Sequence, residues 1–224
     1  TASREMTSNV AGWKRELPMF PLGSVALPGV ALPLQVFEPR YRALVMTCLT
    51  EDRLFGSVLI DRGSEVGGGD RRGDVGSLIR IIQSEELPDG RWAVVGVGVE
   101  RLRVVEWLPD DPFPRCIAEA WIDGEPTDKT SELIGRTLDA TLGLMARLGV
   151  DVTDFRSRPE LDPDASIASF QLAALSPLGP LDRLQALKAD GPDSRLRFLL
   201  ASIEDQTATL DAIDMLNGEV DGSH

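Results

Sequence analysis

Residue types that carry acid–base and nucleophilic chemistry are scarce in this chain. Its single histidine is the last residue, His224, and its two cysteines are Cys48 and Cys116. A Ser–His–Asp or Cys–His centre needs an internal imidazole as general base, and a closed zinc site needs four ligands of this kind. The chain therefore offers neither centre. Each cysteine falls in or beside an apolar stretch, so we predict two buried small hydrophobic residues rather than a disulfide.

Two other patterns resemble sites but lack an essential part. The glycines at 67–69 suggest a phosphate loop, yet a P-loop ends in Gly-Lys-Ser/Thr, and no Gly-Lys pair occurs in the chain. Asp110 and Asp111 form an acidic pair, but the prolines on both sides favour a solvated loop. The same interpretation applies to Asp151, Asp154, Asp162 and Asp164. We therefore expect no metal, no cofactor and no enzymatic activity.

A more promising group lies where a predicted strand meets a predicted helix. Phe37, Glu38, Arg40 and Tyr41 occur together at this corner. As a binding surface, an aromatic and an arginine side chain would anchor an extended peptide. The structural alternative places Phe37 and Tyr41 in the core, with Glu38 capping the helix. Both interpretations stay open from the sequence.

The tryptophans present a similar choice. Trp92, Trp107 and Trp121 fall in predicted strands, while Trp13 precedes the first one. Exposed on one face, the first three would form an adhesive patch for unfolded chains, whereas large aromatic residues are more often core. Trp92 and Trp107 join the four corner residues as candidate polypeptide-binding residues.

Strand patterns fill the first half of the chain. Apolar runs bounded by glycine and proline predict strands at 17–22, 30–37, 54–60, 75–87, 91–99, 101–107 and 116–122. Prolines in the run at 17–22 indicate an edge or bulged strand. Gly96 and Gly98 indicate a bulge or a close backbone approach. Between the second and third strands, Pro39 and the spacing of apolar residues predict a helix ending near Thr50.

Helical periodicity begins after residue 124. It predicts helices at 128–148, 164–175, 181–189 and, capped by Asp193, from there to about Leu216. Strands followed by helices indicate an α+β protein. We divide it into a disordered leader (1–14), a β-rich subdomain (15–124), a helical bundle (125–217) and a polar tail (218–224).

Charge and hydropathy limit the partners. The net charge of −13 opposes nucleic-acid binding, which draws affinity from Lys and Arg, and opposes anionic membranes. No apolar run approaches the roughly 20 residues that span a bilayer, and the start lacks an apolar signal region. We therefore expect a cytoplasmic protein that contacts no membrane.

Several segments, in this order and spacing, resemble the amino-terminal domain of Lon proteases. They are LPMFPL (17–22), LPG (27–29), LPLQVFEPRYR (32–42), GDVGSLIRI (73–81), LPDGR (87–91), VGVERLR (97–103) and DRLQAL (182–187). The resemblance covers about Leu17 to Met215. It implies a PUA-like β pseudo-barrel followed by a carboxy-terminal helical bundle. Lon itself continues into an AAA+ module and a Ser-Lys peptidase, which this chain lacks, so it looks like a stand-alone bacterial Lon-domain protein.

The resemblance also implies a function. It is that of a non-catalytic module for protein quality control, which recognises unfolded or exposed polypeptide and works either alone or by delivering clients to a separate ATP-dependent protease. Exposed apolar residues on the last helix would support a homodimer. The alternative is RNA binding, because PUA-like barrels can bind RNA. Its candidate residues are Arg71, Arg72, Arg80, Arg91, Arg101 and Arg103.

Overall fold

A computed structural model describes residues 12–62, 71–152 and 159–221. The chain forms two compact units. The barrel unit comprises residues 12–26 and 31–122, and the helical unit comprises residues 27–30 and those from 123 onward. The glycines at 67–69, considered above as a phosphate loop, lie outside the described residues.

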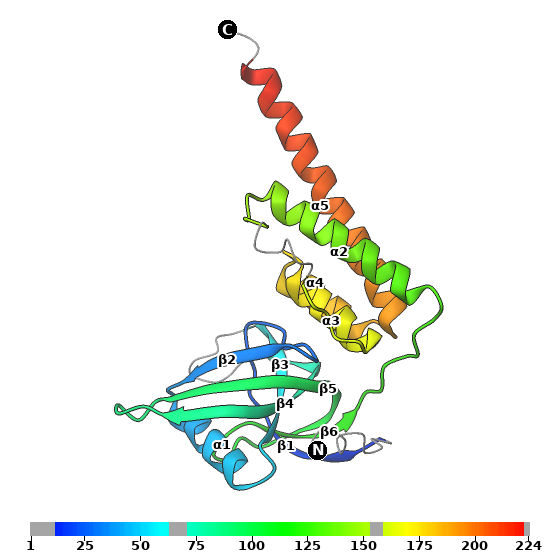
Figure 1. The fold of residues 1–224 in the computed structure, drawn as a ribbon. Coiled ribbons are helices and arrows are strands. Elements are labelled where there is room, and N and C mark those ends of the chain that lie inside the picture. The colour runs from blue at the N-terminus through cyan, green and yellow to red at the C-terminus, as the bar shows by residue number, and fades with distance from the viewer. Residues whose placement is uncertain (1–11, 63–70, 153–158, 222–224) are drawn as a thin grey trace. The chain divides into compact units, whose positions relative to one another are not determined.

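The barrel unit is an antiparallel sheet that closes on itself (Figure 1). Its strands are β1 (Lys14–Pro18), β2 (Ala31–Val36), β3 (Leu54–Arg62), β4 (Arg71–Glu86), β5 (Trp92–Leu108) and β6 (Arg115–Ala120). The main order is β1-β6-β5-β4-β3, and β2 pairs with β5. Directly after β1, Met19 and Leu22 bridge to Gly56 and Leu59 of β3, which joins the two ends of the order. This closure and the helices that follow confirm the predicted α+β pseudo-barrel fold.

Strand β5 corrects one prediction. Residues 91–99 and 101–107 were expected as two strands, but β5 is one strand of 17 residues. Leu78 of β4 pairs with Glu100 and Ile79 with Gly98, so Val99 is an extra residue that forms a bulge. A bulge is one of the two features that Gly96 and Gly98 indicate in the sequence, and it lies beside Gly98. Because β5 is so long, β2 and β4 flank its first half, and β4 and β6 flank its second half.

Helix α1 (Pro39–Thr50) confirms the predicted helix and covers one cluster of the barrel core. Tyr41, Leu44, Val45 and Cys48 point into that cluster, as their helical spacing predicts. The strands contribute Phe55, Ile79, Ile81 and Val94, among others. A second cluster, which includes Leu17, Met19, Leu78, Leu102 and Cys116, lies among β1, β3, β4, β5 and β6.

Both cysteines are buried and free, as predicted. Burial, reinforced by Asp52 and Glu51, raises the pKa of the Cys48 thiol to about 12. Burial, with a smaller contribution from Glu16, raises the pKa of the Cys116 thiol to about 12 as well. Since the thiolate is the nucleophile, we expect the folded protein to react very slowly with a disulfide reagent at about pH 8, and both thiols to react once it is unfolded. Rapid labelling of either thiol in the folded protein would contradict this.

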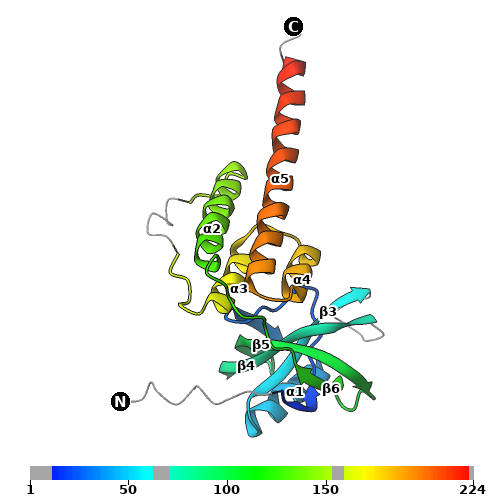
Figure 2. The same cartoon turned by 90° about the vertical axis from the view of Figure 1, so that its right-hand side faces the viewer.

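The helical unit contains α2 (Thr130–Arg147), α3 (Ala165–Leu175), α4 (Pro180–Lys188) and α5 (Pro192–Asp221). Asp164 caps α3 by accepting hydrogen bonds from the backbone N–H groups of Ser166 and Ile167. The prediction that Asp193 caps α5 is wrong. Asp193 lies in the first turn of α5, where it accepts hydrogen bonds from Thr127 and Thr130. Helix α5 also runs beyond the predicted end at Leu216. Its last turns project past the ends of α2, α3 and α4 (Figures 1 and 2).

Candidate functional site

The candidate site is built around β2, which pairs with one strand only among the described strands. Its side chains alternate: Leu32, Leu34 and Val36 turn toward the core, while Pro33 and Gln35 are exposed. Proline has no N–H for a ladder and is therefore confined to strand edges. Pro33 in the middle of β2 fits a strand whose second edge has no strand partner.

A hollow of about 170 Å³, the corner hollow, lies at the end of β2. Its lining comes from β2, from the segment after β1 and from the start of α1: Phe20, Leu22, Pro33, Leu34, Gln35, Val36, Phe37, Glu38 and Tyr41. Phe37, a large aromatic residue that lines this hollow, is 53% exposed. Such a ring is suited to pack against an incoming apolar side chain.

The other corner residues contact one another and the neighbouring Phe20 ring around this hollow. The ring of Tyr41 stacks on that of Phe20, with centroids 4.0 Å apart, and the Arg40 guanidinium lies 4.4 Å from the centroid of the Tyr41 ring. Arg40 Nε donates to a Glu38 carboxylate oxygen over 3.1 Å. Glu38 stands at the N-cap position of α1 without a side-chain capping bond, so the structural interpretation of Glu38 as a cap is wrong. Its carboxylate instead holds Arg40 in place.

A second, larger hollow of about 400 Å³, the sheet hollow, lies on the face of the same sheet and shares Pro33, Leu34 and Gln35 with the first. The register brings its residues into two rows. Pro33, Val95 and Gln83 form one, and Gln35, Ala93 and Glu85 form the other. Ala93 and Val95 contribute short apolar side chains to the lining, and Gln35, Gln83 and Glu85 contribute two amides and a carboxylate. Both hollows border β2, one on each side of the Pro33–Gln35 stretch.

The six candidate residues do not form one cluster. Phe37, Glu38 and Tyr41 line the corner hollow, and Arg40 contacts Tyr41 and Glu38 without lining it. Trp92 pairs with Val36 in the sheet and packs, half-buried, against the core cluster under α1. Trp107 lies in the second half of β5, where it packs against the other cluster and under the guanidinium of Arg72. Sequence reasoning missed Leu34, Gln35, Gln83 and Glu85.

The arginines considered for RNA binding are mostly engaged within the barrel unit. Arg72 forms a double hydrogen bond with Asp110, which lowers the pKa of that carboxyl. Arg91 pairs with Asp89. Arg101 is buried against Trp121 and donates to the Ile122 carbonyl oxygen. Arg103 also lies over Trp121, Arg80 is exposed, and the side chain of Arg71 lies outside the described residues.

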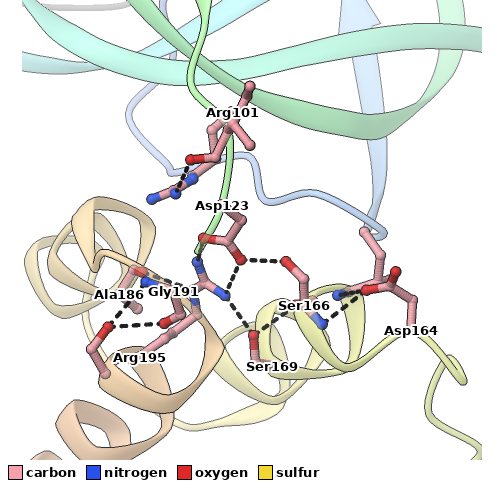
Figure 3. A network of polar contacts seen from close by, with 11 residues as sticks. Arg101, Asp123, Asp164, Ser166, Ser169, Ala186, Gly191 and Arg195 are labelled. Atoms are coloured by element: carbon pink, nitrogen blue, oxygen red, sulfur yellow. Dashed lines mark hydrogen bonds and ion pairs between the residues drawn. The ribbon is translucent and has the colours of Figure 1, made fainter. Parts of the chain in front are cut away.

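The helical unit holds a polar cluster that the sequence did not reveal (Figure 3). Arg195, with no exposed surface, donates to both carboxylate oxygens of Asp123 over 2.7 and 3.1 Å and to Ser169 Oγ over 2.6 Å. Ser166 Oγ donates to the same carboxylate, and Ser169 Oγ donates to a backbone carbonyl. Both hydroxyls are therefore committed to structural bonds, and the carboxylate that would act as a base is neutralised by arginine. The arrangement anchors residue 123 rather than activating a nucleophile.

Within the described ranges, no group of three or more His, Cys, Asp or Glu side chains is arranged to hold a metal ion. No described helix is long and apolar enough to cross a membrane. What the barrel unit does offer is a strand edge between two hollows.

A closed antiparallel barrel, followed in the chain by a helical bundle, defines an α+β protein. The family model of the ATP-dependent protease La (LON) substrate-binding domain matches residues 16–205. The chain belongs to this family. The matched model describes a substrate-binding domain, in agreement with the predicted resemblance.

Curated relatives carry the same domain within longer proteins. The chain is 25% identical over 214 residues to a LON peptidase N-terminal domain and RING finger protein of Schizosaccharomyces pombe, covering 82% of this chain and 44% of that protein. It is 27% identical over 203 residues to Lon protease 2 of Myxococcus xanthus, covering 89% of this chain and 22% of that protein. The chain thus spans less than half the length of these relatives.

Two solved structures of Lon N-terminal domains are similar to this chain. A Lon N-terminal domain protein from Xanthomonas campestris is 30% identical, with a TM-score of 0.60, and the match covers 84% of this chain and 98% of that one. The N-terminal domain of a Mycobacterium avium complex Lon protease has the same TM-score at 19% identity, covering 85% and 99% of the two chains, and is similar in fold.

Proposed function

We propose that the protein binds exposed segments of unfolded polypeptide at β2 and has no catalytic role of its own. The observation that carries the proposal is the position of the β2 edge between the corner hollow and the sheet hollow. An extended peptide can add to such an edge through its main chain, while pockets receive alternate side chains. Main-chain recognition tolerates many sequences, as a module for unfolded clients requires.

The geometry also favours unfolded over folded clients. A folded protein has nearly all its buried backbone N–H and C=O groups paired already, so it cannot add a strand to β2 without losing bonds of its own. An unfolded segment has these groups available and also exposes apolar side chains. In the proposed complex, one apolar side chain of the segment rests on the ring of Phe37, and its neighbours along the strand face Gln35 and the sheet hollow.

Phe37→Gln is expected to weaken binding of a permanently unfolded, reduced and alkylated model protein by about tenfold or more, because burial of an aromatic ring contributes roughly 1.5–3 kcal/mol. Met46→Gln is the matched control, since Met46 is 58% exposed on α1 and lines neither hollow. Fluorescence anisotropy with labelled client gives the affinities.

The folded form of the same model protein and a single-stranded RNA serve as further ligands. Selective capture of the unfolded chain supports the proposal. Equal affinity for the folded form, or equal loss of binding in both variants, would overturn it. RNA binding that weakens steeply with salt would support the alternative function instead.

We further propose that captured clients are passed to a separate ATP-dependent protease in the cytoplasm. The support is that relatives named Lon protease contain the same domain. With a Lon-type protease, the added protein should speed degradation of the unfolded client, and its Phe37→Gln variant should not. Unchanged degradation alongside intact client binding would remove delivery but leave the binding proposal standing.

A further inference from the structure

The end of α5 forms a surface whose apolar residues lack a partner within the described part of the chain. Both views of the ribbon show these turns projecting past the other helices of the unit (Figures 1 and 2). All residues from 211 to 216 are exposed, and among them Ile213, Met215 and Leu216 are 46%, 72% and 65% exposed. Most helices in proteins owe their stability to tertiary packing rather than to propensity, so this stretch calls for a ligand that packs on it.

The surface has a defined starting point. A hollow of about 280 Å³ lies between the end of α2 and the middle of α5, lined by Leu148, Asp205, Gln206, Thr209 and Leu210. Leu210, Ile213 and Leu216 follow at three-residue intervals, so they continue one face of α5 outward from the hollow. We call this face, from Leu148 to Leu216, the distal α5 surface.

Carboxylates border the distal α5 surface on both sides. Asp205 lines the hollow on one side. On the other side Asp211 and Asp214 are held by Arg147 from the end of α2, the Asp214 contact at 2.8 Å. From Phe198 to Leu216 the sequence contains no Lys or Arg.

The negative charge around the distal α5 surface favours a basic partner over a second copy of the chain. In paired helices the residues that flank an apolar seam set the partner, and like charges there oppose pairing. A second copy of the chain would bring the same carboxylates to both sides of the seam, which argues against the expected homodimer. We propose instead that the distal α5 surface binds a basic amphipathic helix of another protein. Its leucine-type residues would cover Leu210, Ile213 and Leu216, and its Lys or Arg side chains would pair with Asp205 and the neighbouring carboxylates.

A synthetic helix tests this with the full chain. The probe is a peptide of about 20 residues, long enough to form a helix, with leucines on one face and flanking lysines. Its counterpart carries glutamates in place of the lysines. We expect the lysine peptide to bind, to bind more weakly as salt rises, and to bind at least about tenfold more tightly than the glutamate peptide. Anisotropy of a labelled peptide gives these affinities.

Variants locate the site. Ile213→Gln and Leu216→Gln should each weaken binding of the lysine peptide by about tenfold, and both keep a good helix former at an exposed position. Leu181→Gln should leave it unchanged, since Leu181 is 72% exposed on α4 and outside this surface. Far-UV circular dichroism confirms that the variants stay helical.

Three results would overturn the proposal: equal binding of the two peptides, an equal loss of affinity in Leu181→Gln, or a dimer of the chain alone that Ile213→Gln dissociates in sedimentation. The last would identify a second copy as the occupant. Since none of these variants touches β2, unfolded-client binding is expected to persist in all of them, so the two proposals succeed or fail separately.

Discussion

Asp123→Ala should destabilise the helical unit by about 3–5 kcal/mol, the cost of leaving a buried charge without its partner. Arg195 has no exposed surface, and Asp123 accepts two of its hydrogen bonds. Burial already lowers the pKa of the Arg195 guanidinium. Its other contacts are with neutral groups: Ser169, the Ala186 carbonyl oxygen and the ring of Phe170. None of them supplies the negative charge that balances the guanidinium. Asp123→Ala therefore lowers stability both by leaving the Arg195 charge unpaired and by removing two hydrogen bonds.

The double variant Asp123→Ala/Arg195→Met separates these contributions. Replacing both members of a buried ion pair by apolar residues is often close to neutral, so the double variant should recover much of the stability that Asp123→Ala loses. Urea unfolding followed by far-UV circular dichroism, which reports on the helices, measures both. A loss below about 1 kcal/mol in Asp123→Ala would mean that the pair behaves as a solvated surface pair.

Predictions from the sequence succeeded where local chemistry determines structure. Pro39 and the spacing of Tyr41, Leu44 and Cys48 place α1 at the residues expected, because proline suits the first turn and the apolar residues share a face. The order of strands and then helices gave the correct fold class. The resemblance to the Lon amino-terminal domain, which extends over many segments, is confirmed by the family match.

Strand β5 shows where local reasoning fails. The charged pair Glu100 and Arg101 interrupts the alternation and suggests a break, yet the strand continues. The bulge at Val99 shifts the alternation by one residue, and Arg101 is buried because Trp121 and the Ile122 carbonyl oxygen receive its guanidinium. A contact with a residue far along the chain thus overrides the local pattern. Arg195 and Asp123 escaped notice for the same reason.

The candidate site was predicted in part. The corner was predicted because Phe37 and Tyr41 flank a strand–helix junction. Pro33 also indicates an edge strand, but the prediction of the corner did not use it. The sheet hollow was not foreseeable, since the register of three strands brings Gln35, Ala93 and Glu85 into one row. Trp107 was grouped with Trp92 because the sequence does not show that one long strand carries both residues and brings them to different core clusters.

Gly76→Ala should destabilise the barrel unit by about 3 kcal/mol, at the upper end of overpacking effects. A methyl group at Gly76 would come within 1.9 Å of the Ser57 carbonyl oxygen and 2.8 Å of Val58 Cγ1. The nearest atom belongs to the backbone of β3, which pairs with β4 at this position, so no side-chain rotation relieves the collision. The two strands must separate, and the sheet that carries Gln83 and Glu85 loosens with them.

The readout can be confined to the barrel unit, because all four tryptophans lie within it. Their fluorescence in urea should show an earlier transition in Gly76→Ala than in the unmodified protein. Gly143→Ala is the contrasting substitution. Apart from its chain neighbours and the nearby backbone of its own helix, no atom of the described residues lies within 4 Å of the added methyl in α2, so it should stabilise its helix by about 0.5–1 kcal/mol and leave the fluorescence transition in place. If Gly76→Ala unfolds at the same urea concentration as the unmodified protein, β3 and β4 pair less closely at Gly76 than the register requires. If its unfolded-client binding falls while folding is retained at low temperature, the β4 side of the sheet hollow takes part in recognition together with β2.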